Sequence, residues 1–411
     1  MINYTKRILS NGLTVLVHED CNTSLIAVNV LYNVGSKDEN PEKTGFAHLF
    51  EHLMFEGSVH IASFDRVLEE AGGENNAFTN NDFTNYYLNI PKENIETALW
   101  LESDRMLNLA FSEERLENQK KVVIEEYKQR YLNQPYGDAW LLLRPLAYTI
   151  HPYRWPTIGK EINHIKHCTL DEVKKFFQEY YIPANASLCM SGNIRAEQAF
   201  SLAEKWFSDI PDKKKKQRLL PVEPPQTAQR HKSVYRSVPS EAIYIAFHMC
   251  SRTNAMFYAT DLLSDILSAG QSSRLYISLV KEKQLFSQID AFITNDIDEG
   301  LFIITAKLMP DISMKTAENA IWEEIQKIQK NGPTHKELEK VKNRAECNFI
   351  LANTNVQNKA MNLAYYELLG DAGLINKEPE NIQRVTTDDI KHVAASILTE
   401  NNSSTLYYFK K

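Results

Sequence analysis

Two histidines and a glutamate share one short segment, His48-Leu49-Phe50-Glu51-His52. On a helix, His48 and His52 are four residues apart, so their imidazoles project from the same face about one turn apart. Two nitrogen ligands of a single Zn²⁺ need this separation. Glu51 borders the same position without having to bind the metal. It could therefore take a proton from water that the metal activates.

This H-x-x-E-H arrangement is the signature of the inverted zincins. The alternative is a pair of surface histidines on an amphipathic helix that binds no metal. Four apolar residues surround the pair: Leu49, Leu53, Met54 and Phe55. They predict a largely buried helix, in which two histidines and a glutamate without a metal would carry a large desolvation cost. We therefore favour a metal site.

A catalytic zinc site needs a third protein ligand and one open position. The best source is the predicted helix 112–131, which begins with a capping pattern at Ser112 and contains Val122-Val123-Ile124-Glu125-Glu126. Glu126 lies four residues after Val122 and three after Val123, so we expect it to share their inward face. Glu125 is rotated away by about 100°. The spacing selects Glu126, against the alternative of an exposed glutamate on a charged helix.

The segments that carry these residues alternate between strand and helix patterns. Apolar segments bounded by turn residues predict strands at 12–17, 25–34 and 187–190, and alternating Phe, Thr and Tyr predict a strand pair within 78–89. Helices are predicted at 44–55, 64–71, 95–109, 112–131 and 169–181. This mixture indicates an α+β fold, in which helices cover one face of a mostly antiparallel or mixed sheet.

The two halves of the chain resemble each other. The segment Thr169–Lys174 matches Thr386–Lys391 at an offset of 217 residues, and Ala98–Trp100 matches Ala320–Trp322 at an offset of 222. Their shared order predicts a duplicated domain. Between the halves, four prolines and a basic run predict an exposed connector. We therefore expect a metal-binding domain at 1–211, a linker at 212–229 and a homologous domain at 230–411.

Composition limits the classes of protein that this chain can belong to. Of its 411 residues, 43% are apolar and 24% are charged, which is ordinary for a globular protein, and the net charge of −7 argues against nucleic-acid binding. No apolar stretch approaches the roughly 20 residues of a membrane span, and no signal peptide is visible. Five scattered cysteines suggest reduced thiols. We expect a cytoplasmic protein without a membrane partner, or a periplasmic one if a signal was removed.

Four motifs together carry a family resemblance. They are His48–His52, Gly72–Thr79, Val122–Glu126 and Ser272–Tyr276. In this order they resemble the family of pitrilysin and the mitochondrial processing peptidase, and the whole chain is similar to its short bacterial two-domain members. The resemblance implies that His48, His52 and Glu126 are zinc ligands and that Glu51 is the general base.

The resemblance also implies how the substrate is held. Asn76 and Ala77 would lie on an edge strand that pairs with the substrate backbone, and Arg274 matches an arginine of a substrate clamp in the second domain. The usual clamp tyrosine is replaced by the segment Gln284–Ser287. Relatives often carry an acidic residue seven positions before Glu126, where this chain has Gln119. A glutamine there would tune the metal ligands more weakly.

The second half lacks the donor set. When the two halves are aligned, Asp261, Ser264 and Asp265 occupy the positions of His48, Glu51 and His52, and Asn348 occupies the position of Glu126. We therefore expect one Zn²⁺ per chain.

By resemblance, the chain is a zinc metalloendopeptidase that cleaves peptides or unfolded segments inside a chamber of paired subunits. The pair would be a homodimer or a heterodimer with a similar subunit. The alternative is a non-catalytic or partner-dependent scaffold subunit, which predicts the loss of ligands or base.

Overall fold

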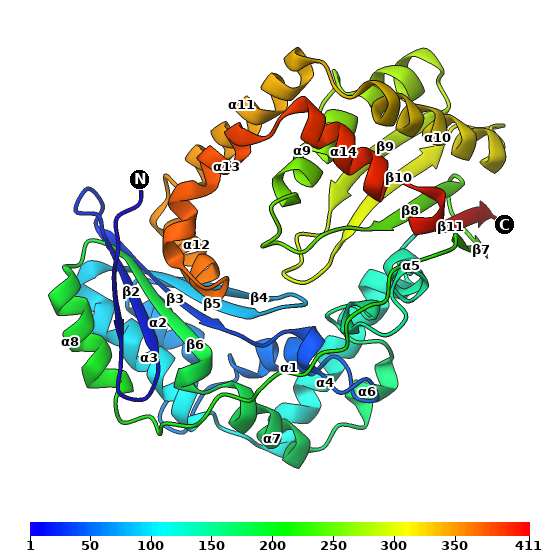
Figure 1. Ribbon diagram of the computed structural model, residues 1–411. Helices are drawn as coiled ribbons and strands as arrows, with labels where there is room; N and C mark the ends of the chain where they lie inside the picture. Colours follow the sequence, from blue (N-terminus) through cyan, green and yellow to red (C-terminus); the bar gives the residue numbers. More distant parts are fainter. The chain divides into compact units, whose positions relative to one another are not determined.

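The computed structural model describes residues 1–411 and shows two compact units (Figure 1). Unit 1 contains Met1–Tyr127, Trp155–Leu220 and Ile350–Lys377. Unit 2 contains Lys128–Arg154, Pro221–Phe349 and Glu378–Lys411. Each unit combines one mixed sheet with several helices, which confirms the predicted α+β fold. None of the helices has the length and apolar character that a membrane crossing requires.

Unit 1 is built on a six-stranded sheet in the order β1-β2-β6-β3-β5-β4. Its strands are β1 (Thr5–Ile8), β2 (Thr14–Glu19), β3 (Leu25–Tyr32), β4 (Glu74–Thr79), β5 (Thr84–Pro91) and β6 (Ala186–Gly192). Strands β2 and β6 pair in parallel, and the other neighbours are antiparallel. From Ile26 to Tyr32 every residue of β3 is buried. Both faces of this sheet are therefore covered.

Five helices of unit 1 lie close to their predicted positions: α1 (Phe46–Leu53), α2 (Phe64–Glu70), α3 (Ile95–Asn108), α4 (Glu113–Tyr127) and α7 (Leu170–Tyr180). The unit also contains three helices that were not predicted, α6 (Ile162–Lys166), α8 (Ala196–Phe207) and α12 (Val356–Leu368). The helix predicted at 112–131 is α-helical only to Tyr127, after which the π-helix η3 covers Lys128–Leu132. The predicted strand pair begins earlier than expected, at Glu74.

The two faces of the first sheet are covered by helices from different halves of the sequence. Tyr86 of β5 donates a hydrogen bond to the carbonyl oxygen of Phe50 in α1 at 3.4 Å. Asn89, on the opposite face of the same strand, donates to Gln357 of α12 at 2.6 Å. Helix α12, which lies more than 250 residues after β5, thus covers the face that α1 leaves open. The expectation that helices cover only one face of this sheet is therefore wrong.

Unit 2 repeats this sheet. Its strands are β7 (Arg230–Arg236), β8 (Ala242–His248), β9 (Phe286–Ile293), β10 (Leu301–Leu308) and β11 (Ser403–Lys410), in the order β7-β11-β8-β10-β9. Among its helices are α5 (Ala139–Ala147), α9 (Phe257–Ser268), α10 (Met314–Asn331), α13 (Glu378–Arg384) and α14 (Thr387–Ile397), and α11 (His335–Ala352) begins in this unit. Ile243 and Ile245 pack on the side of α9 and α10, whereas Ala242 and Ala246 pack on the side of α5.

The duplication predicted from the sequence is visible in this topology, because β2-β6-β3-β5-β4 and β7-β11-β8-β10-β9 have the same order and the same parallel pair. Asn185 and Asn402, which match at the offset of 217, perform the same task. Asn185 donates to the carbonyl oxygens of Asn33 and Tyr180, and Asn402 donates to those of His248 and Ile397. The compact units differ from the expected division at 1–211 and 230–411, because Lys128–Arg154 packs in unit 2 and Ile350–Lys377 packs in unit 1.

The connector between the halves has no helix or strand and is mostly exposed up to Leu220. It is nevertheless attached within each unit. In unit 1, Arg218 forms an ion pair with the buried Asp38 at 2.7 Å. In unit 2, both carboxylate oxygens of Glu223 accept hydrogen bonds from the backbone amides of residues 149–151. Part of the segment expected to be a solvated linker is therefore anchored.

Candidate metal centre

Helix α1 presents two histidines on one face and packs the other face into the core. Leu49 and Phe50 are completely buried, and the ring of Phe50 stacks on Phe176 and Tyr181. The rings of His48 and His52 lie on the remaining face with their centroids 4.9 Å apart. The spacing of four residues thus places the two imidazoles side by side, as the sequence predicted.

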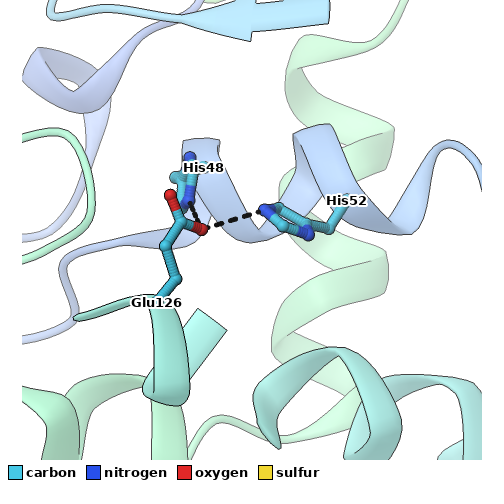
Figure 2. Close-up of side chains that lie close together, drawn as sticks. All are labelled: His48, His52 and Glu126. Atoms are coloured by element: carbon cyan, nitrogen blue, oxygen red, sulfur yellow. Dashed lines mark hydrogen bonds and ion pairs between the residues drawn. The ribbon is translucent and has the colours of Figure 1, made fainter. Parts of the chain in front are cut away.

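The third donor comes from helix α4. One carboxylate oxygen of Glu126, Oε2, lies 2.9 Å from Nε2 of His48 and 3.4 Å from Nε2 of His52 (Figure 2). The donor atoms of these three residues all lie within 4.8 Å of one another. Val123 is buried and Glu125 is exposed, in agreement with the predicted orientation of α4. Val122 is 47% exposed, so its expected inward position is wrong, and the inward face is set by Val123 and Tyr127.

Glu51 lies beside this group without joining it. Its Oε2 atom is 3.6 Å from Nδ1 of His48, the nitrogen that faces away from Glu126. Burial alone would raise the pKa of the Glu51 carboxyl. Hydrogen bonds with His48 and Thr79, together with the charges of both histidines, outweigh burial and hold this pKa below its usual value. Glu51 is therefore a carboxylate that can accept a proton near neutral pH.

The charges around His48 favour a cation. Burial works to lower the pKa of its imidazole, but the carboxylates of Glu126 and Glu51 raise this pKa to about 9. The two carboxylates thus make this position favourable for a positive charge, either a proton on His48 or a metal ion that replaces the proton. Two imidazole nitrogens and one carboxylate oxygen at this separation fit Zn²⁺ with three protein ligands and an open position.

The expected substrate-binding residues of unit 1 lie on an edge strand. Asn76 and Ala77 belong to β4, which pairs only with β5 and forms the edge of the first sheet. The backbone amide of Ala77 donates to Oδ1 of Asn76 at 2.8 Å. Helix α1 packs near this strand. An edge at this place can accept an extended peptide as a further strand.

Arg274 belongs to unit 2, where it is already paired. Its guanidinium donates two hydrogen bonds to the carboxylate of Glu337, at 2.7 and 2.9 Å, and a third to the carbonyl oxygen of Gly332. The Thr334-His-Lys-Glu337 segment is a helix-capping pattern, and Glu337 also accepts from the Thr334 amide. That pattern was available in the sequence, but it does not reveal the pairing with Arg274.

Two further contacts near the centre could not be found from a motif. Gln119 of α4 donates a hydrogen bond to the carboxylate of Glu56, which follows α1. Glu39 accepts hydrogen bonds from the backbone at the start of α1. Neither partner stands at a spacing that a helix or a strand would predict.

Two family models match the chain, over separate ranges. Residues 14–139 match the family model described as Insulinase (Peptidase family M16), and residues 167–345 match the one described as Peptidase M16 inactive domain. The candidate donors lie within the first match. Asp261, Ser264 and Asp265 lie within the second.

Individual proteins are also similar to this chain over its whole length. The chain is 30% identical to the zinc protease PqqE of Helicobacter pylori, over 97% of this chain and 91% of that protein. A crystal structure of a protease from Helicobacter pylori superimposes with a TM-score of 0.93 at 29% identity, and the match covers all of both chains. Pitrilysin has a TM-score of 0.77 at 18% identity, over 99% of this chain and 45% of pitrilysin, which shows a shared fold alone.

Proposed function

Because the chain belongs to peptidase family M16, whose relatives include a named zinc protease, we propose that it is a zinc metalloendopeptidase. His48, His52 and Glu126 would hold one Zn²⁺ per chain, and Glu51 would be the general base. The observation that carries this proposal is the position of Glu126 Oε2, within hydrogen-bonding range of His48 and 3.4 Å from His52. Three donors from two helices converge on one point.

When bound at this point, Zn²⁺ supplies the Lewis acidity that activates water and polarises a peptide carbonyl. Glu51 would accept a proton from the attacking water, because its side chain is ionised near neutral pH and lies beside the donors. It then returns this proton to the nitrogen of the leaving amine as the C–N bond breaks. The same carboxylate thus acts first as base and then as acid, and it ends the cycle with the negative charge that it had at the start.

The substrate would lie along β4. An extended peptide that pairs with the outer edge of this strand uses main-chain hydrogen bonds, which do not depend on its side chains. Asn76 and Ala77 would provide this contact. The proposed substrates are therefore peptides or unfolded segments rather than folded proteins.

We further propose that the working form is a dimer, either of identical subunits or with a similar partner. A chain with two units of this fold matches less than half of pitrilysin, so two chains would be needed for a comparable enclosure.

The free thiols agree with a reducing, cytoplasmic location.

A second candidate is a subunit that is active only with a partner. The pairing of Arg274 with Glu337 favours it, because a guanidinium held by a carboxylate is not available to a peptide. In that case the partner would complete the clamp. Activity that appears only after a second subunit is added would support this candidate over the first.

The deciding experiment compares metal content and hydrolysis of an unstructured peptide in the wild type, Glu51→Gln and Glu125→Gln. We expect Glu51→Gln to retain zinc and to lose activity by about a hundredfold to ten-thousandfold, the usual contribution of a general base. The exposed Glu125→Gln variant should behave as the wild type. Undiminished hydrolysis by Glu51→Gln would refute the proposed role of this residue.

A further inference from the structure

Helix α1, which carries His48 and His52, has no side-chain cap at its N-terminus. Helix α1 contains only eight residues, and the residue at its N-cap position is Gly45, which has no side chain to accept a hydrogen bond from the first turn. Gly45 has a φ of +93°, and a Cβ atom there would lie 2.7 Å from the carbonyl oxygen of Ile158. A capping side chain therefore cannot be placed at this position. A helix this short is marginal without outside support.

Glu39 provides this support from outside the helix. It follows the 3₁₀ turn η1 (Ser36–Asp38), and both of its carboxylate oxygens accept from the start of α1. Oε2 accepts from the amide of Gly45 at 2.9 Å, and Oε1 accepts from the amide of Ala47 at 2.8 Å. A carboxylate at a helix N-terminus also interacts favourably with the helix dipole.

Burying the carboxylate of Glu39 costs free energy of desolvation. Its hydrogen bonds to the start of α1 offset part of this cost. Glu39 is buried, and burial raises the pKa of its carboxyl, although the hydrogen bonds from the amides of Ala47 and Gly45 oppose the shift. The neighbouring charge of Asp38 raises this pKa further. At the start of α1 the Glu39 carboxylate is bound by the backbone amides of Gly45 and Ala47 and not by a positively charged side chain.

The capped turn leads directly into the donors. The amide of Ala47 immediately precedes His48, and His52 lies one turn further along the same helix. Glu126 comes from a different helix, so its distance to both histidines depends on where α1 begins and how it is oriented. A shift of α1 would move both imidazoles together relative to Glu126.

We propose that Glu39 is a positioning residue for the metal centre: it fixes the start of α1 through the amides of Gly45 and Ala47 and thereby sets the two histidines against Glu126. The inference rests on the proposed function, because it concerns the same centre. The hydrogen bonds that Glu39 accepts at α1 come from backbone amides and not from the three donor side chains. Its effect passes through the backbone of α1.

The test compares Glu39→Gln with Glu42→Gln, an exposed glutamate three residues later in the same loop. Glutamine has the shape of glutamate but only one acceptor oxygen, so one of the two amides loses its partner. The measurements are the dissociation constant for Zn²⁺ by chelator competition, the visible absorption of the Co²⁺-substituted protein, and kcat and KM on an unstructured peptide.

We expect Glu39→Gln to bind Zn²⁺ about tenfold or more weakly, to alter the Co²⁺ absorption and to lower kcat more than it changes KM. Glu42→Gln should match the wild type in all three. If Glu39→Gln fails to fold, Glu39→Asp, which keeps the charge but is too short to reach both amides, is measured instead. The inference is overturned if the folded variant matches Glu42→Gln in metal affinity and spectrum. A wild type that neither binds Zn²⁺ nor cleaves peptide would instead refute the proposed function.

Discussion

Glu126 lies 78 positions after His48 in the sequence, yet its Oε2 atom is 2.9 Å from Nε2 of that histidine. The same oxygen is 3.4 Å from Nε2 of His52. One oxygen shared between two imidazoles, in a group of three donors from two helices, is the geometry from which the metal proposal follows. Its first consequence concerns metal affinity.

Replacing Glu126 with glutamine should weaken zinc binding far more than replacing its neighbour. Glutamine removes the negative charge and the anionic oxygen that a dication prefers. We expect Glu126→Gln to lose at least about a hundredfold in zinc affinity, at or above the upper end of what supporting residues contribute. Glu125→Gln, which alters an exposed carboxylate on the same helix, is the matched control. Equal affinities in a chelator competition would exclude Glu126 as a ligand.

Removing the metal should lower the melting temperature of the wild type. A ligand that binds only the folded state stabilises it by about 4 kcal/mol when its free concentration is a thousand times its dissociation constant. Dialysis against a chelator should therefore lower the melting temperature, and added Zn²⁺ should restore it. The change should be much smaller in Glu126→Gln. A wild-type melting curve that does not respond to Zn²⁺ would contradict a metal centre that bridges α1 and α4.

The parts of this centre that the sequence predicted are those with local spacing. His48 and His52 share a face because a helix repeats every 3.6 residues, and Glu126 was separated from Glu125 by the same rule. The predicted cap at Ser112 is also local, since its hydroxyl accepts a hydrogen bond from the amide of Arg115, three residues later. Such features can be predicted from a few neighbouring residues, without knowing which distant segments pack against them.

The parts that were not predicted depend on contacts between distant segments. Helix α12 covers the first sheet although it belongs to the second half of the sequence, and no local pattern identifies which sheet an amphipathic helix will cover. The pairing of Arg274 with Glu337, 63 positions away, is of the same kind. Both contacts depend on tertiary packing.

The ion pair of Arg274 and Glu337 should make unit 2 sensitive to acid. The hydrogen bonds from Arg274 are the largest cause that lowers the pKa of Glu337, from its usual value of 4.5 to about 2. A lowered carboxyl pKa contributes stability that is complete above pH 4.5 and is lost as the pH falls toward 2. Arg274→Met should remove this contribution and move acid unfolding, followed by circular dichroism, to a higher pH. Arg384→Met, which removes an exposed pair with Glu380, should leave the midpoint nearly unchanged.

The hydrogen bond from Gln119 to Glu56 joins α4 to the segment that follows α1, and it can be tested by exchanging the two side chains. Gln119→Glu would place two carboxylates in contact, at a site where both side chains are only partly exposed. Like charges repel, so we expect a loss of about 1–2 kcal/mol at neutral pH, or a few degrees in melting temperature. The repulsion disappears when one carboxylate is protonated, so the loss should shrink as the pH is lowered. The double variant Glu56→Gln/Gln119→Glu restores one donor and one acceptor in reverse order, and it should recover the wild-type melting temperature if the hydrogen bond between these two side chains holds the end of α1 to α4.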